Sequence, residues 1–211
     1  MVDMHEERPA AAARAPGEGA PKWAGLGILL IVLGGVGWLA STALLVERLR
    51  ALQNPGVSLA CDFSPFVSCG ALFDRWQASL LGFPNPIIGV AGFIAPMVIG
   101  AGILAGARFS PWFWRATCGG LLAAWVFVTW LFSQSVFEIG VLCPYCLVVW
   151  AATIPLWWST IVITVANGQW GVRAAHGVGS TLTRYLPVII VANFAVIAIA
   201  IVLRFPYLFG A

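Results

Sequence analysis

Charged side chains are scarce in this sequence. Only 9% of its 211 residues are Asp, Glu, Lys or Arg, while 61% are hydrophobic. Soluble domains carry about 25% charged residues, so the charges needed to cover a core in water are missing. The composition therefore excludes an ordinary soluble protein and makes the lipid bilayer the main solvent of the chain. We expect one compact bundle of helices and no separate soluble domain.

Excess positive charge and histidine are scarce as well. The net charge is only +3, which provides no basic surface of the kind that binds nucleic acid. The only two histidines are His5, in the N-terminal tail, and His176, before the last apolar run. The sequence therefore indicates neither a nucleic-acid partner nor a histidine-rich metal site.

Five apolar runs dominate the rest of the chain. They lie at about 24–46, 86–107, 112–135, 141–166 and 186–203. Because about 20 apolar residues cross the hydrocarbon core of a bilayer, each run predicts one transmembrane helix. The first run is too long for the apolar region of a cleaved signal peptide, so we interpret it as an uncleaved span. The predicted fold class is an all-α integral membrane protein.

The runs divide the chain into three parts. Residues 1–22, rich in Ala, Pro, Gly and charge, predict a disordered cytoplasmic tail. Residues 23–166 contain four spans and one long outer loop, 47–85, and predict a four-helix bundle. Residues 167–211 contain a cytoplasmic loop and the fifth transmembrane helix. Five spans place the two termini on opposite sides of the membrane.

Basic residues and cysteines together predict the orientation in the membrane. With a cytoplasmic N-terminus, seven basic residues lie on the cytoplasmic side and four on the outer side, which favours this orientation. Two of those four arginines directly follow the first span and weaken the count. The same orientation places Cys61, Cys69, Cys143 and Cys146 on the outer, oxidising side, where disulfides persist. We therefore expect a multi-pass protein of the cell (inner or cytoplasmic) membrane with extracytoplasmic cysteines.

The outer loop predicts two kinds of structure. Its middle, around Cys61 and Cys69, carries Pro and Ser and is expected to be irregular. In residues 71–83, hydrophobic side chains recur with helical spacing between polar ones. An amphipathic helix of this kind lies in the membrane interface, so we expect a short helix that covers the outer end of the bundle.

Cys143 and Cys146 form a C-P-Y-C motif at the start of the fourth run. On a helix, residues three apart lie on the same face, and the helix N-terminus stabilises a thiolate. Thiols in such settings titrate at about 3.5–7.5, against about 8.5 for a free thiol. Because a more stable thiolate is a better leaving group, the motif favours thiol–disulfide exchange over a structural disulfide.

Other interpretations of the cysteines stay open. C-X-X-C is half of many zinc sites, but the seven residues between Cys61 and Cys69 are the wrong spacing for the other half, so no metal site is predicted. Taken alone, Cys61 and Cys69 favour a disulfide that only staples the loop. Because eight extended residues span at most about 26–29 Å, Cys61 can reach a partner outside while Cys69 reaches the bundle. Cys118, near the cytoplasmic side of the third run, is interpreted as a packing residue.

The order of these features resembles a known family. Two loop cysteines seven residues apart, an Arg-Trp pair in the amphipathic segment, Asn85 just before the second run and C-P-Y-C at the start of the fourth resemble the vitamin K epoxide reductase family over about residues 24–166. The segment CDFSPFVSCG and the following WQASLLGFPNPIIGV are similar to those of its bacterial, actinobacterial-type members.

The resemblance implies a four-helix bundle around a quinone site, with the loop cysteines at its outer mouth. Bacterial members take the place of disulfide bond formation protein B. They reoxidise a thioredoxin-like (DsbA-like) disulfide donor and pass two electrons to a membrane quinone, for which menaquinone is the natural choice here and ubiquinone the alternative. Some members carry a fused thioredoxin domain after a fifth helix. Because this sequence stops at Ala211, we expect the donor to be a separate protein.

The resemblance also implies roles for the four cysteines. Cys61 would exchange with the partner, and Cys69 would then exchange with Cys143. Cys146, deeper in the helix, would react with the quinone ring. The family thus implies a catalytic relay that leads from an aqueous loop into the membrane.

Two further residues are implied in quinone binding. Asn85 would donate a hydrogen bond to a quinone carbonyl, stabilising the developing negative charge; the alternative is a turn residue between two prolines. Trp150 stands where vertebrate members have a Tyr, four residues after the second cysteine of the motif. Its indole N–H would contact the quinone, or its ring would pack on it.

Three alternatives to disulfide generation stay open. Reduction of a quinone epoxide would use the same four cysteines, although the bacterial-type loop and the missing Tyr favour disulfide generation. A non-enzymatic structural membrane protein with a stapled loop would need no reactive thiol. A carrier of electrons across the bilayer would need a cysteine pair accessible from both sides, and Cys118 is the only cysteine in the inner half.

Overall fold

The computed structural model describes residues 20–171 and 175–206, and the regular elements in these ranges are helices. In chain order they are α1 (Ala20–Gln53), α2 (Gly70–Phe73), η1 (Trp76–Ser79), α3 (Pro86–Leu104), α4 (Pro111–Ser133), η2 (Gln134–Ile139), α5 (Pro144–Ala166) and α6 (Ala175–Arg204). Of these, η1 is a 3₁₀-helix and η2 a π-helix. Within the described ranges, β-structure is limited to isolated bridges.

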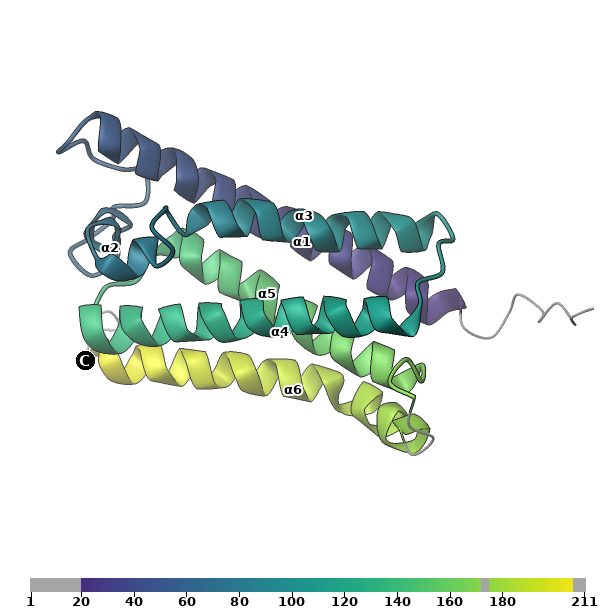
Figure 1. The fold of residues 1–211 in the computed structure, drawn as a ribbon. Coiled ribbons are helices and arrows are strands. Elements are labelled where there is room, and N and C mark those ends of the chain that lie inside the picture. Colours follow the sequence, from purple (N-terminus) through teal and green to yellow (C-terminus); the bar gives the residue numbers. More distant parts are fainter. Residues whose placement is uncertain (1–19, 172–174, 207–211) are drawn as a thin grey trace, which may run out of the picture.

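Five of the helices, α1, α3, α4, α5 and α6, are long and apolar enough to cross a membrane. They run alternately in opposite directions, so the start of α1 and the end of α6 lie at opposite ends of the bundle (Figure 1). The short helix α2 lies at the end where α1 finishes and α5 begins. This arrangement confirms the predicted all-α integral membrane protein with five spans.

The contact between α1 and α3 depends on glycine. A Cβ atom at Gly100 would lie 2.5 Å from the carbonyl oxygen of Gly27, and one at Gly37 would lie 2.3 Å from the ring of Phe93. Small residues let two helix backbones approach this closely in lipid. The two helices therefore pack closely against each other at these glycines.

The first four spans share a core that α6 does not enter. Leu26, Leu30, Phe93, Trp114 and Leu156 pack together from α1, α3, α4 and α5. By contrast, none of the most apolar 18-residue segment of α6 is buried within the protein. Helix α6 therefore lies outside a four-helix bundle, against α5, with most of its apolar surface available to lipid.

Helix α1 is longer than the apolar run that predicts it. It begins at Ala20, inside the segment 1–22 that we expected to be disordered, and continues to Gln53, inside the predicted loop. Residues 38–53 contain neither Gly nor Pro, and the helix ends before the turn sequence Asn54-Pro55-Gly56. The rest of the predicted tail, residues 1–19, lies outside the described residues.

The loop contains two short helical turns where we expected one helix over 71–83. Arg75, between α2 and η1, has an extended backbone with φ −90° and ψ 143°, which ends the first turn. Phe73 is consequently buried, whereas Trp76 is 65% exposed. Phe73 therefore packs inside the protein and Trp76 lies on its surface, so the two side chains do not form one amphipathic face.

Candidate redox site

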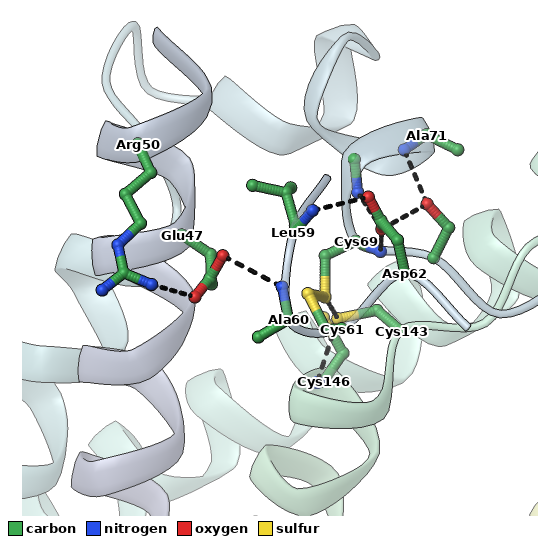
Figure 2. Close-up of a disulfide and its surroundings, with 12 residues drawn as sticks. Glu47, Arg50, Leu59, Ala60, Cys61, Asp62, Cys69, Ala71, Cys143 and Cys146 are labelled. Carbon is green, nitrogen blue, oxygen red and sulfur yellow. Dashed lines mark hydrogen bonds and ion pairs between the residues drawn. A yellow bond between two sulfur atoms is a disulfide. The ribbon is translucent and has the colours of Figure 1, made fainter. Parts of the chain in front are cut away.

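Four cysteines meet at one end of the bundle (Figure 2). Cys61 and Cys69 form a disulfide, while Cys143 and Cys146 are free thiols at the start of α5. The Sγ atoms of Cys69 and Cys143 lie 3.4 Å apart, although 74 positions separate the two residues in the chain. Only a short movement separates this contact from a covalent S–S bond of about 2.05 Å.

The start of α5 positions Cys143. This residue is the N-cap, with an extended backbone, and Pro144 begins the helix, a position that suits proline. The Cys143 sulfur accepts a hydrogen bond from the backbone N–H of Cys146 at 3.4 Å. A hydrogen bond from the Cys146 side chain, helped by backbone N–H groups, outweighs burial and lowers the pKa of Cys143. A stabilised thiolate at this position is a nucleophile that faces the loop disulfide.

A β-bridge holds the loop against the residues that precede α5. The N–H of Ser68 donates to the carbonyl of Leu142 at 3.0 Å, and the N–H of Leu142 donates to the carbonyl of Phe66 at 2.8 Å. Because Cys69 follows Ser68 and Cys143 follows Leu142, this pairing brings the two sulfur atoms together. Sequence reasoning missed the bridge, since an isolated pairing has no alternating pattern that would reveal it.

Asp62 fixes the conformation of the loop between the two cysteines. Its Oδ1 accepts hydrogen bonds from the N–H of Cys69 at 2.9 Å, the N–H of Gly70 at 3.1 Å and the hydroxyl of Ser68 at 2.7 Å. Its Oδ2 accepts from the N–H of Leu59 at 3.4 Å. Burial opposes the charged form, but these bonds outweigh burial and lower the pKa of Asp62. Sequence reasoning also missed this role, although an Asp in a loop rich in Pro and Ser is a turn signal.

The last turns of α1 provide an anchor for the loop. Glu47 is only 5% exposed; its carboxylate pairs with Arg50 at 2.9 Å and accepts a hydrogen bond from the N–H of Ala60 at 3.4 Å. The guanidinium of Arg48 lies 5.2 Å from the centre of the Phe73 ring. These contacts attach both the start of the loop and α2 to the extended part of α1.

Protein atoms cover the loop disulfide. Cys61 is 1% exposed and Cys69 is fully buried, in a cluster with Leu44, Leu59 and Phe73. The loop is therefore folded against the bundle and does not extend outward as the reach argument for Cys61 allowed. A protein partner can reach the Cys61 sulfur only after this cover moves.

Comparison of the sequence with models of known protein families gives a match that covers more than half of the chain. A family model described as the vitamin K epoxide reductase family matches residues 28–161, a range that contains all four clustered cysteines. The chain belongs to this family. No curated protein matches the sequence.

Membership of the vitamin K epoxide reductase family makes the protein a membrane oxidoreductase that acts on thiols. The enzymes of this family use quinones and generally work with thioredoxin-like partners. The matched range covers most of α1 and α5 and everything between them, so the family region and the four-helix bundle largely coincide. Helix α6 lies beyond it.

Asn85, implied in quinone binding by the family resemblance, lies in the turn between η1 and α3. Its Nδ2 donates to the backbone carbonyl of Gln77 at 2.6 Å, and its Oδ1 accepts from the N–H of Leu80 at 3.2 Å. These bonds fit a turn residue. Because an amide nitrogen carries two protons, a second donor site remains for another acceptor.

Trp150, the other residue implied in quinone binding, is part of an apolar cluster. It is 4% exposed, and its ring packs edge-to-face on Phe132 with 4.6 Å between centroids. Val136 and Leu142 complete this side of the cluster, and Cys146 packs against it. The Cys146 thiol therefore borders an apolar wall to which α4, η2, α5 and the end of α6 all contribute.

Cys118 lies apart from the redox site. It is near the start of α4, at the opposite end of the bundle, where it is 1% exposed and its sulfur lies 3.5 Å from the hydroxyl of Thr164. Both observations fit a packing residue. Across the ranges 20–171 and 175–206, no three His, Cys, Asp or Glu side chains come together in a way that could hold a metal ion.

Proposed function

We propose that the protein is a quinone-dependent thiol–disulfide oxidoreductase that drives disulfide formation outside the cell membrane. It would reoxidise a separate thioredoxin-like disulfide donor and pass two electrons through Cys61 and Cys69, then Cys143 and Cys146, to a membrane quinone. The observation that carries the proposal is the 3.4 Å contact between the sulfur atoms of Cys69 and Cys143. This contact joins the two cysteine pairs into one path.

Electrons enter at the loop disulfide. A thiolate of the reduced donor attacks the Cys61 sulfur, which forms a mixed disulfide and releases Cys69 as a thiolate. The second donor thiol then resolves the mixed disulfide, so the donor leaves oxidised and Cys61 becomes a thiol. Two electrons have moved from the donor to the loop, as thiol–disulfide exchange requires.

Electrons then pass from the loop to α5. The Cys69 thiolate attacks Cys143 in an oxidised Cys143–Cys146 pair, which forms a Cys69–Cys143 disulfide and releases Cys146. Cys61 next attacks Cys69, restores the loop disulfide and releases Cys143. The product has a loop disulfide and two free thiols on α5, which is the arrangement in the structure.

The surroundings of Cys146 suit a quinone ring. Cys146 packs against apolar clusters on two sides, one from the loop and one containing Trp150, and Asn85 keeps one amide proton free for a carbonyl. When bound, a quinone supplies an acceptor for the two electrons and two protons that Cys143 and Cys146 lose on returning to a disulfide. Menaquinone is our first choice and ubiquinone the alternative.

The same proposal fixes the orientation and the division of the chain. The cysteine end faces the extracytoplasmic side of the cell membrane, and the N-terminus lies in the cytoplasm. Residues 23–166 form the catalytic bundle, and residues 167–211 add a cytoplasmic loop and the fifth span. The excess of basic residues on the inner side supports this orientation.

An anaerobic assay of electron transfer tests the proposal. The full chain in detergent is mixed with a reduced thioredoxin-like donor and a short-chain menaquinone analogue, and quinone absorbance is followed. We expect one quinone reduced per donor dithiol oxidised. The Cys146→Ala variant should reduce no quinone, because the last sulfur of the path is missing, whereas Cys118→Ala should behave like the wild-type protein.

Two outcomes would contradict the proposal. The relay is wrong if Cys146→Ala reduces quinone at the wild-type rate. Disulfide generation is wrong if the wild-type protein leaves both donor and quinone unchanged; a quinone epoxide supplied with a small dithiol would then test the epoxide reductase alternative with the same four cysteines.

A further inference from the structure

Gln77 is a buried polar side chain with an unused hydrogen-bonding atom. It belongs to η1 and is 9% exposed. Its Nε2 donates to the Oε1 of Gln134 at 3.2 Å, but its own Oε1 is buried and has no hydrogen-bond partner among the described residues. Buried polar atoms in native proteins almost always have a partner. The free oxygen therefore points to a ligand that hydrogen-bonds at this position.

The Gln77–Gln134 pair lies where the loop meets the end of α4. On the loop side, the backbone carbonyl of Gln77 accepts a hydrogen bond from Asn85, the residue implied in quinone binding. On the bundle side, Gln134 follows Trp130 by one helical turn, and the Trp130 ring lies 6.0 Å from that of Trp76, the neighbour of Gln77. The amide pair is thus a polar group next to Asn85, on the face of α4 that contacts the loop.

The chemistry of an amide matches both redox forms of a quinone. A quinone oxygen is only an acceptor, whereas the corresponding hydroxyl of the reduced form is also a donor. An amide offers a donor and an acceptor on one planar group, and a half-turn about its last bond exchanges the two positions. In the observed arrangement the free Oε1 of Gln77 accepts from the hydroxyl of the reduced ligand. If both amides turn together, Gln134 donates to the Oε1 of Gln77, and the Nε2 of Gln77 donates to the oxygen of the oxidised ligand.

We propose that Gln77, held by Gln134, binds one oxygen of the quinone ring. This inference rests on the proposed function, because it places a residue in the same quinone site. In this assignment Gln77 is a binding residue that contacts the substrate, and Gln134 is a positioning residue that orients the amide. Neither group takes part in the transfer of electrons.

Equilibrium binding of a short-chain menaquinone analogue to the full chain in detergent tests this assignment. The dissociation constant is measured from quenching of tryptophan fluorescence, together with the melting temperature of each variant. The variants are Gln77→Leu, Gln134→Leu and the double Leu variant. Gln53→Leu is the matched control, since Gln53 is an exposed amide near the same end of the bundle.

We expect Gln77→Leu to bind the analogue about threefold to tenfold more weakly, the loss that one neutral hydrogen bond produces. The double variant separates an effect on ligand binding from an effect on protein stability. Replacing both partners of a hydrogen bond by apolar groups can be nearly neutral for stability, so its melting temperature should recover, while its affinity for the analogue should stay low. Gln53→Leu should bind like the wild-type protein.

Three results would overturn the inference. The first is an unchanged dissociation constant in Gln77→Leu, and the second is recovery of both melting temperature and affinity in the double variant, which would make the pair purely structural. The third is absence of binding to the wild-type protein, which would also remove the quinone from the proposed function. If the wild-type protein binds the analogue but accepts no electrons from the donor, the proposed function fails, and the dissociation constants still decide the role of Gln77.

Discussion

Replacing Asp62 with alanine is expected to release the redox loop while the helical bundle stays folded. The carboxylate of Asp62 accepts four hydrogen bonds from the loop, two of them from the backbone N–H groups of Cys69 and Gly70. The Asp62→Ala variant removes both carboxylate oxygens and so all four hydrogen bonds at once. None of these bonds involves a membrane-spanning helix, so the loss should be confined to the segment that carries the loop disulfide.

The expected size of the effect follows from these bonds. A hydrogen bond to a charged group contributes about 1.5–3 kcal/mol. Because Asp62 is exposed, water will replace part of this energy, and we assign about 2–3 kcal/mol to the two backbone bonds together. At about 1.4 kcal/mol per factor of ten, the backbone amides of Cys69 and Gly70 should exchange their protons about 30- to 150-fold faster.

Hydrogen exchange of the full chain in detergent, read by mass spectrometry on peptides that cover the loop, measures this change. A second readout is the rate of exchange between Cys143 and Cys69 in a single turnover, which should fall because the two sulfur atoms are no longer held 3.4 Å apart. Asp74→Ala is the matched control. The Asp74 side chain is 91% exposed, and its contact with Arg48 is 3.9 Å long.

Unchanged protection of the two amides in Asp62→Ala would refute this reasoning, since it would show that the β-bridge to Leu142 holds the loop alone. Faster hydrogen exchange with an unchanged rate of thiol–disulfide exchange would show that the order of the loop and the distance between the two sulfur atoms are independent. In that case the contact between Cys69 and Cys143 would not depend on Asp62.

Two further predictions concern the helix contact and the pH dependence. Gly100→Ala should lower the free energy of unfolding by about 1–3 kcal/mol, because the added Cβ would meet a backbone atom. Thermal denaturation in detergent measures this loss. Gly92→Ala, on the same helix, is the control, because a Cβ there meets nothing within 4 Å; equal losses in the two variants would contradict the packing argument. The rate at which the Cys143 thiolate attacks Cys69 in the loop disulfide, the reverse of the last exchange in the proposed relay, can be followed by release of the Cys61 thiol. It should rise with pH and level off below the ordinary thiol pKa of about 8.5, because the pKa of Cys143 is lowered. Asp62→Asn should move that midpoint further down, since the negative charge of Asp62 raises the pKa of Cys143; a midpoint at or above the ordinary value would contradict the assigned hydrogen bonds.

The transmembrane helices could be predicted from the sequence because the bilayer imposes a length on each of them. The five apolar runs correspond to α1, α3, α4, α5 and α6, with differences at the ends. The position of C-P-Y-C at the start of α5 was equally predictable, since Pro144 suits the first residue of a helix. These features depend on local sequence, which a single chain reveals.

Features that depend on contacts between distant segments could not be predicted in the same way. The bridge between Val67 and Leu142 joins residues far apart in the chain, and neither residue carries a distinctive pattern. The break in the helix at Arg75 could not be predicted either. The helical spacing of hydrophobic residues in 71–83 continues past Arg75, whereas the burial of Phe73 favours two separate turns. In the sequence, Gln77 is one of several polar residues in the segment 71–83, and its unpaired oxygen is evident only once its surroundings are known.

The length of α1 affects how the two proposed substrates reach the cysteines. Its 34 residues span about 51 Å, well beyond a hydrocarbon core of about 30 Å, and the chain then returns from its tip toward the start of α5 (Figure 1). The sulfur atoms therefore lie where α5 enters the membrane, beneath a protein cover. Under the proposed function, the donor arrives from water along the bundle axis and the quinone arrives sideways from the lipid. The two substrates then do not compete for one entrance, so an excess of oxidised donor should leave the dissociation constant for quinone unchanged.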